Sequence, residues 1–184
     1  YGAYDKLTHT GLYGVDTTKD TVENLLGIDI NYVFRVNFTS MIDIVDALGG
    51  IDIDVAEGMA VSRFYTNSTL EGVHEGTNHL DGKRALAYSR ERKAYIDGDV
   101  QRARNQQQVL QAMFKKATSP EIITKYTSLL KALTHAFDTN MSTKEITSFI
   151  KYQIQAKPSW KFEQYVLKGD NDLQVSPELG SEVS

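Results

Sequence analysis

The chain has 184 residues, with 20 lysines and arginines against 24 aspartates and glutamates, 41% hydrophobic residues and no cysteine. These figures are typical of a folded chain and exclude disordered and collagen-like proteins, and the lack of cysteine excludes disulfides, thiolate catalysis and cysteine-based zinc sites. A formal net charge of -4 argues against a surface built to hold nucleic acid.

A helix and then a strand are predicted first. Residues 16–26 have a polar start, carry apolar side chains at helical spacing and stop at Gly27, which is the pattern of a short helix. Residues 31–38 alternate between apolar and polar side chains, which favours a strand. The apolar face of this strand holds Tyr32, Phe34, Val36 and Phe38.

A second helix and strand follow. Thr39 or Ser40 can cap a helix that carries apolar residues as far as Leu48, just before two glycines. Residues 51–55 alternate between isoleucine or valine and aspartate, which predicts a strand. We therefore expect a strand–helix–strand unit in this part of the chain.

The rest of the chain predicts one loop and mainly helices. Residues 56–79 show no sustained periodicity and are expected to form a loop. The further expected elements are helices over 81–90, from Asp99 to about Thr118, over 120–137 and over 142–156, a strand near 161–167 and a polar tail over 170–184. Because no repeat or low-complexity tract interrupts the chain, residues 1–184 are predicted to form a single domain.

Basic residues are concentrated in one stretch of this acidic chain. Residues 83–104 carry seven lysines and arginines against three acidic residues. Five of the chain's seven arginines lie there, at positions 84, 90, 92, 102 and 104. Arginine keeps its charge, and its planar fork binds phosphate through two parallel hydrogen bonds. The stretch therefore indicates a local site for an anion.

The long helix refines this prediction. Asp99, Arg102 and Gln106 fall within one arc of a helical wheel, and that arc continues into apolar residues. We therefore expect these three side chains to point inward, and we expect the opposite face, with Arg104 and Asn105, to be solvated. Since a buried charge must be paired or bind a ligand, the arrangement fits either a binding site or a structural Asp99–Arg102 ion pair.

The relative orientation of two more arginines depends on the local backbone, and the histidines indicate no further site. Arg90 and Arg92 share a face if their segment is extended, but lie roughly 200° apart in a helix. The four histidines show no metal-ligand spacing, so the residues themselves identify no metal site.

Several motifs occur in a fixed order over most of residues 5–118. They are Asp5-Lys6-Leu7-Thr8-His9, residues 21–28, Asn37-Phe38, residues 44–51, Leu80-Asp81-Gly82 with residues 85–92, and Gly98-Asp99-Val100-Gln101-Arg102 with Gln106-Gln107. This series resembles the LytR-CpsA-Psr family of Gram-positive bacteria, whose members attach anionic or capsular glycopolymers to peptidoglycan. The Asn-Phe-Thr-Ser form at 37–40 is similar to the streptococcal capsule branch.

The resemblance implies an α/β fold in which a mixed β-sheet is sandwiched between helices, in three layers, around a pocket for a polyprenyl (pyro)phosphate. It implies magnesium as a cofactor, with its ligands in N-terminal strands that precede this chain, so that no metal ligand is expected here. The residues implied in catalysis are Arg90, Arg92, Asp99 and Arg102. Those implied in substrate binding are Lys6, Arg90, Arg92, Arg102 and Gln106.

The implied function is phosphotransfer. A sugar-1-phosphate unit moves from a lipid pyrophosphate to a peptidoglycan hydroxyl, and prenyl phosphate leaves. The implied location is the outer face of the cytoplasmic membrane, with an anchor outside this chain, since no apolar run here approaches the ~20 residues that span a bilayer. The alternative is a non-catalytic domain that binds prenyl phosphate and regulates capsule synthesis or attenuates transcription. DNA binding is disfavoured by the net charge and the lack of a helix-turn-helix pattern.

Overall fold

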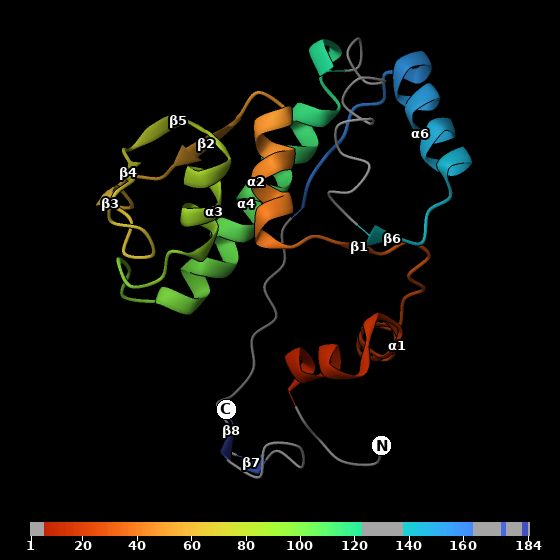
Figure 1. Ribbon diagram of the computed structural model, residues 1–184, viewed down its shortest axis with the longest axis horizontal. Coiled ribbons are helices and arrows are strands. Elements are labelled where there is room, and N and C mark those ends of the chain that lie inside the picture. The colour runs from red at the N-terminus through yellow and green to blue at the C-terminus, as the bar shows by residue number, and fades with distance from the viewer. Residues whose placement is uncertain (1–5, 123–137, 164–173, 176–181, 184) are drawn as a thin grey trace. The chain divides into compact units, whose positions relative to one another are not determined.

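The computed structural model describes residues 6–122, 138–163, 174–175 and 182–183 (Figure 1). The chain divides into two compact units, one formed by residues 1–33 with 165–184 and the other by residues 34–164. No helix in these described ranges is long and apolar enough to cross a membrane.

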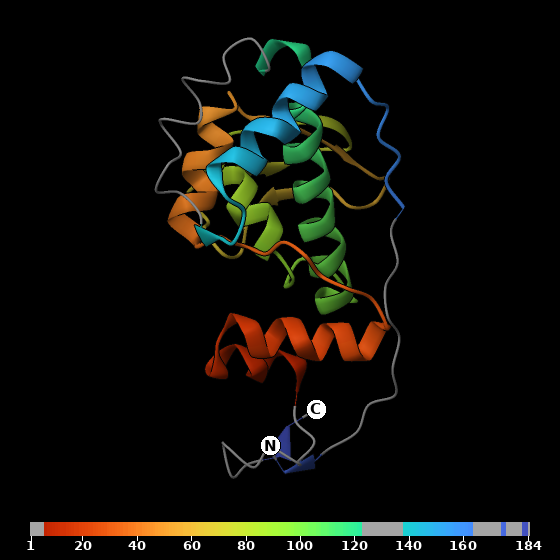
Figure 2. The ribbon, with the colours of Figure 1, turned by 90° about the vertical axis from the view of Figure 1, so that its right-hand side faces the viewer.

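The smaller unit contains η1, a 3-10 helix over Leu7–Tyr13, and α1 over Val15–Leu26. The two lie side by side (Figure 2). α1 confirms the first predicted helix and ends at Gly27, whose φ of 64° is a left-handed conformation that favours glycine. The predicted polar tail contains a short antiparallel pair, β7 (Gln174–Val175) and β8 (Glu182–Val183).

The first predicted strand is much shorter than expected, because a helix takes over its end. β1 covers only Phe34–Arg35, and α2 covers Phe38–Ala47. The cap of α2 is Asn37, not Thr39 or Ser40: its side chain accepts a hydrogen bond from the Ser40 amide at 2.8 Å. Asparagine is a strong helix cap, and its capping bond outweighs the alternating pattern here.

The strand predicted over residues 51–55 is confirmed, but the loop predicted over 56–79 is wrong. β2 covers Ile51–Val55, and the supposed loop contains three strands: β3 (Val61–Arg63), β4 (Glu71–Val73) and β5 (Gly76–Leu80). β3 and β4 have three residues each, too few to show a period in the sequence.

The strands of the described ranges form four separate antiparallel pairs. β2 pairs with β5, β3 with β4, and β1 with β6 (Asp138–Thr139), where Arg35 Nη2 donates to Asp138 Oδ2 at 2.7 Å. The predicted α/β class is confirmed. Each described strand has a single partner, so these ranges show strand pairs where one mixed sheet was expected.

The predicted helices of the larger unit are confirmed where the structure describes them. They are α3 (Gly82–Arg90), α4 (Gly98–Ala117) and α6 (Thr143–Ala156). Another helix starts at residue 120 as predicted, and its continuation over 123–137 lies outside the described residues. Residues 161–163 form no strand, and the rest of the strand predicted to 167 also lies outside them.

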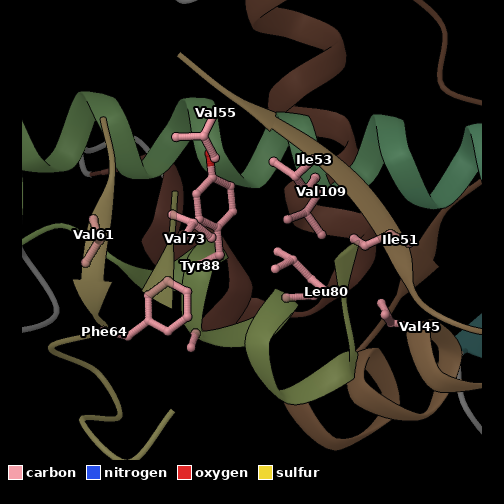
Figure 3. Packing of buried hydrophobic residues seen from close by; sticks show 12 residues of the cluster. Val45, Ile51, Ile53, Val55, Val61, Phe64, Val73, Leu80, Tyr88 and Val109 are labelled. Carbon is pink, nitrogen blue, oxygen red and sulfur yellow. The ribbon is translucent and has the colours of Figure 1, made fainter. Parts of the chain in front are cut away.

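The core of the larger unit lies between the β2–β5 pair and helices α3 and α4 (Figure 3). β2 buries every second side chain, as its alternation predicts, and Leu80 of β5 is fully buried. Tyr88 of α3 places its ring among Val55, Val73 and Phe64. This packing fixes α3 and α4, which carry the charged residues singled out by the sequence.

Candidate functional site

Close packing of α3 against α2 determines where Arg90 lies. A Cβ at Gly82 would lie 2.4 Å from Ile42 O, so only glycine allows this approach, and the Gly82 amide donates to Asp46 Oδ1 at 2.7 Å. The start of α3 is thereby held near the end of α2. At the other end of α3, the Arg90 guanidinium carbon lies 4.5 Å from the ring centre of Phe38, the first residue of α2.

The backbone turns from helical to extended immediately after Arg90. Glu91 has φ -68° and ψ 128°. Its side chain is fully buried, whereas Arg90 and Arg92 on either side of it are exposed. Arg90 and Arg92 are therefore both accessible on either side of a buried residue, and their sharing of one face stays a prediction.

Gly98 brings the start of α4 against Arg92. A Cβ at Gly98 would lie 2.4 Å from Arg92 O and 3.3 Å from Arg92 Cβ. The first turn of α4 therefore sits directly on the Arg92 backbone, and Asp99 follows in that turn.

Asp99 brings two of the predicted arginines together. Its Oδ1 lies 3.6 Å from Arg92 Nη1 and 3.2 Å from Arg102 Nη2. The side chains remain accessible, with 52% of Arg92, 70% of Asp99 and 38% of Arg102 exposed. We call these three residues, together with the exposed Arg90 two positions before Arg92, the arginine group.

The charges of the arginine group do not cancel. Asp99 is the only carboxylate among the described residues that pairs with its arginines. Two guanidiniums against one carboxylate leave a positive surplus on an accessible surface, to which the exposed Arg90 adds a further positive charge close in sequence. Most guanidinium N–H donors are not used by the two ion pairs. An anion with several oxygens, such as a phosphate, fits this surplus.

The predicted orientation of α4 is wrong. Asp99 and Gln106 are exposed and Arg102 is half-buried, whereas Asn105, expected to be solvated, is completely buried with Val109. The wheel places Asn105 on the solvated side because it lies outside the arc of Asp99, Arg102 and Gln106, the predicted inward face. The Asn105 amide instead donates to Tyr88 O at 3.1 Å and its Oδ1 accepts from Gln101, so both polar side-chain atoms have a hydrogen-bond partner despite burial.

The structure does not test the two remaining predicted ligands, Lys6 and Gln106. Gln106 lies exposed on α4, and among the contacts described for this part of the chain none joins it to the group. Lys6 belongs to the smaller unit, where it precedes η1. Both stay predictions.

Arg84 belongs to the basic stretch but has a structural role. It donates to three backbone carbonyls, those of Glu71 at 3.2 Å, His79 at 2.9 Å and Gly72 at 2.6 Å. Its guanidinium therefore ties α3 to β4 and β5, so not every basic residue of the stretch is available to bind an anion.

Two tyrosines of the larger unit, the buried Tyr88 and the half-buried Tyr95, stay protonated at neutral pH. Burial raises the pKa of the Tyr88 phenol, whose hydroxyl donates to Gln108 Oε1 at 2.6 Å. Burial also raises the pKa of Tyr95, which lies between Arg92 and Asp99 in the sequence and donates to Met59 O at 3.4 Å. Neither phenol is a proton acceptor.

The described residues do not form a magnesium site. They contain no group of three His, Cys, Asp or Glu side chains that could hold a metal ion. Asp99, the carboxylate of the arginine group, is already shared by two guanidiniums. Magnesium needs carboxylate and other oxygen ligands, so these residues do not fit the ion on their own.

Two residues that shape the site were missed by sequence reasoning. Glu91 is one acidic residue within a basic stretch, and nothing in the pattern shows that it is buried. Gly98 could have been found, because a glycine directly before an acidic helix start is compatible with close approach of another segment. Both act on the position of Arg92.

These observations define an α/β protein with an accessible cluster of arginines around Asp99, where the turn after α3 meets the start of α4. The chain belongs to the LytR_cpsA_psr family, whose model matches residues 2–177.

Individual relatives agree with this assignment. The chain is 34% identical over 170 residues to the polyisoprenyl-teichoic acid–peptidoglycan teichoic acid transferase TagU of Bacillus licheniformis, covering 92% of this chain and 53% of the relative. It is 37% identical over 144 residues to the corresponding transferase TagT of Bacillus subtilis, covering 77% and 44%. A solved structure of TagT bound to LI-WTA matches with a TM-score of 0.66 at 32% identity, covering 83% of this chain and 56% of that one. The chain thus spans about half the length of the curated relatives it matches.

Proposed function

We propose that this chain carries the phosphate-binding part of an enzyme that transfers a glycopolymer from a polyprenyl pyrophosphate carrier to peptidoglycan. The observation that carries the proposal is the pairing of Arg92 and Arg102 on one oxygen of Asp99, which leaves a positive surplus on an accessible surface. Relatives named as teichoic acid transferases, at 34% and 37% identity, support it.

The proposed step is displacement at phosphorus. A peptidoglycan hydroxyl oxygen attacks the phosphorus attached to the glycan, a new P–O bond forms, and the anhydride P–O bond breaks. Prenyl phosphate leaves with the electron pair of that bond, and the hydroxyl proton passes to a base. The negative charge on the phosphoryl oxygens and the leaving phosphate needs stabilisation, which is the largest contribution a protein makes to this chemistry.

The arginines and the carboxylate of the arginine group have different roles in this step. Arg90, Arg92 and Arg102 bind the pyrophosphate oxygens and neutralise their charge. Asp99 orients Arg92 and Arg102, since both ion pairs use the same oxygen. We propose no magnesium ligand among the described residues, and no step assigned to these side chains depends on the ion.

The place of action follows from the substrates. Peptidoglycan and its lipid-linked precursors meet at the outer face of the cytoplasmic membrane, so we propose that this face of a Gram-positive cell is where the protein works. A capsular polysaccharide is the proposed cargo, because of the Asn-Phe-Thr-Ser segment at 37–40.

A second candidate is a regulatory domain that binds prenyl phosphate without turnover. It is favoured by the combination of an anion-binding arginine group with the lack of a metal-binding group among the described residues. The two candidates share the phosphate site and differ in catalysis.

A transfer assay tests the proposal. The protein is incubated with a polyprenyl-pyrophosphate-linked saccharide and peptidoglycan glycan strands. Two products are measured: the polyprenyl phosphate that is released and the saccharide that becomes bound to the strands. We expect both products with the unchanged protein and neither with Arg92→Ala/Arg102→Ala, while Arg104→Lys, an exposed arginine on the same helix, serves as the control. Binding of the lipid without either product would establish the regulatory candidate instead.

A further inference from the structure

The residue between Arg90 and Arg92 is a carboxylate with no exposed surface. Glu91 is 0% exposed, although it follows the end of α3 on the surface of the larger unit. A buried carboxylate is unfavourable unless it is paired with a cation or fully hydrogen-bonded. No lysine, arginine or histidine in the described ranges forms an ion pair with it, so its hydrogen bonds must supply the compensation.

Those hydrogen bonds all come from backbone amides. Glu91 Oε1 accepts from the amides of Arg92 and Lys93, each at 3.0 Å, and from that of Ala94 at 3.3 Å. Glu91 Oε2 accepts from the amide of Tyr65 at 2.6 Å. One oxygen therefore folds the following three residues into a turn, and the other ties this turn to the segment after β3.

This arrangement determines the path of the backbone at Arg92. The Arg92 amide is held by Glu91, and its carbonyl lies against Gly98 at the start of α4. Both peptide groups of Arg92 are thus fixed, one by the buried carboxylate and one by the helix that carries Asp99 and Arg102. A long flexible arginine contributes most to binding when its backbone is already in place.

We propose that Glu91 is a positioning residue for the phosphate-binding arginines: its buried carboxylate, by gathering four backbone amides, holds Arg92 opposite Asp99 and Arg102. The inference deepens the proposed function and rests on it. Glu91 itself does not touch the phosphate.

The substitution Glu91→Gln separates this role from simple space filling. Glutamine has the same shape, but one of the two oxygens becomes an NH₂ group that donates. The one remaining side-chain oxygen can accept from the amides of residues 92–94 or from the amide of Tyr65, but not from both. The other set of amides then faces the NH₂ group, which makes no bond to an N–H. The turn then loses one of its two anchors.

The test measures binding of inorganic pyrophosphate to the 184-residue chain by calorimetry, together with thermal melting. We expect Glu91→Gln to weaken pyrophosphate binding about tenfold, the factor of one charge-assisted hydrogen bond at its lower limit. The matched control is Asn78→Ala, because Asn78 is also buried and makes three hydrogen bonds, to the backbone of His74 and Gly76, none of them to the arginine group. That variant should lose melting temperature and keep its affinity.

The outcomes are distinct. Equal affinity of Glu91→Gln and the unchanged chain would overturn the positioning role and leave the arginine site standing. Equal weakening by Glu91→Gln and Asn78→Ala would overturn it too, because the loss would then follow stability alone. Failure of the unchanged chain to bind pyrophosphate would overturn the proposed site and this inference with it.

If Glu91→Gln does not fold, Glu91→Asp is measured in its place with the same expectation. Aspartate keeps the charge but is too short to reach both sets of amides.

Discussion

Arg90 and Phe38 stack across two helices, with the guanidinium carbon 4.5 Å from the centre of the ring. An aromatic ring attracts a guanidinium through its π-face and takes up none of the hydrogen-bonding capacity of a partner oxygen, so the N–H donors stay available. These donors are the part that binds phosphate oxygens. The contact therefore restrains Arg90 without consuming the donors that an anion needs.

The first prediction concerns Arg102→Lys, which keeps the charge and loses the planar fork. Pyrophosphate affinity should fall about tenfold if Arg102 binds an oxygen pair, since lysine offers only a point charge. The melting temperature should hardly change, because the accessible Asp99–Arg102 pair contributes about 0–1 kcal/mol. Calorimetry and melting on the same sample measure both.

The control for that experiment is Arg104→Lys, on the same helix and exposed. It should leave the affinity unchanged. Normal affinity of Arg102→Lys would remove this residue from the phosphate site, and a large fall in melting temperature would identify a structural ion pair.

The second prediction distinguishes two roles of Asp99. Asp99→Asn removes a negative charge beside both guanidiniums, so pyrophosphate should bind about fourfold more tightly, the effect of one charge roughly 5 Å away in water. Asparagine still accepts a hydrogen bond, so an orienting role predicts that the transfer rate falls by less than about tenfold. A general base typically contributes a factor of about 100 to 10,000, and a loss of that size with binding intact would show that Asp99 accepts the acceptor's proton.

The third prediction is that Gly98→Ala damages the site through the backbone. The added methyl group would lie 2.4 Å from Arg92 O, so the turn that carries Arg92 must move away from α4. We expect a loss of about 1–3 kcal/mol in the free energy of unfolding, as for other overpacked positions, with weaker pyrophosphate binding. Gly11→Ala, where nothing lies within 4 Å of the new methyl group, should change neither quantity.

The fourth prediction concerns alkaline pH. Burial raises the pKa of Tyr88 above its ordinary value of 10.0, so the folded protein keeps this proton at a pH where the unfolded chain releases it. Stability is therefore complete below pH 10 and falls as the pH rises above it, at up to about 1.4 kcal/mol per pH unit for this group. Tyr95 adds a change of the same sign.

Urea unfolding at pH 8 and pH 11 measures this effect. Tyr88→Phe should be less stable at pH 8 by about 1 kcal/mol, because it loses the hydrogen bond to Gln108, and should lose less stability between the two pH values than the unchanged chain. An equal pH dependence in both proteins would show that Tyr88 does not titrate differently on folding.

Local signals in the sequence predict the helices well. Gly27 ends α1, Asp81 caps α3 by accepting from the Arg84 amide, and Ser142 forms a capping box with Glu145 at the start of α6. These interactions span a few residues, so they are visible in the sequence. Two of the arginines that the sequence singled out also lie together in the structure, since Arg92 and Arg102 both form an ion pair with Asp99.

The failures involve contacts between distant segments. Asn105 is buried because Tyr88 O, in another helix, accepts from its amide, and no pattern within α4 contains that information. β3 and β4 exist because they pair with each other, with Val61 opposite Val73. Glu91 is buried because the Tyr65 amide reaches it. Each case depends on a partner that only the tertiary structure supplies.

The pairing of β1 with β6 bears on the order of folding. Arg35 and Asp138 are 103 residues apart, and the entropy lost on closing a loop rises with its length. The pairing contributes little stabilisation, because each strand has two residues and the side chains of the Arg35–Asp138 ion pair are 67% and 74% exposed. β2 and β5 are much closer in sequence and bury Ile51 opposite Leu80. We therefore expect the β2–β5 pair to form early with α3 and α4, and the β1–β6 pair to form last and open first. Its amides should exchange with solvent while the arginine group stays assembled.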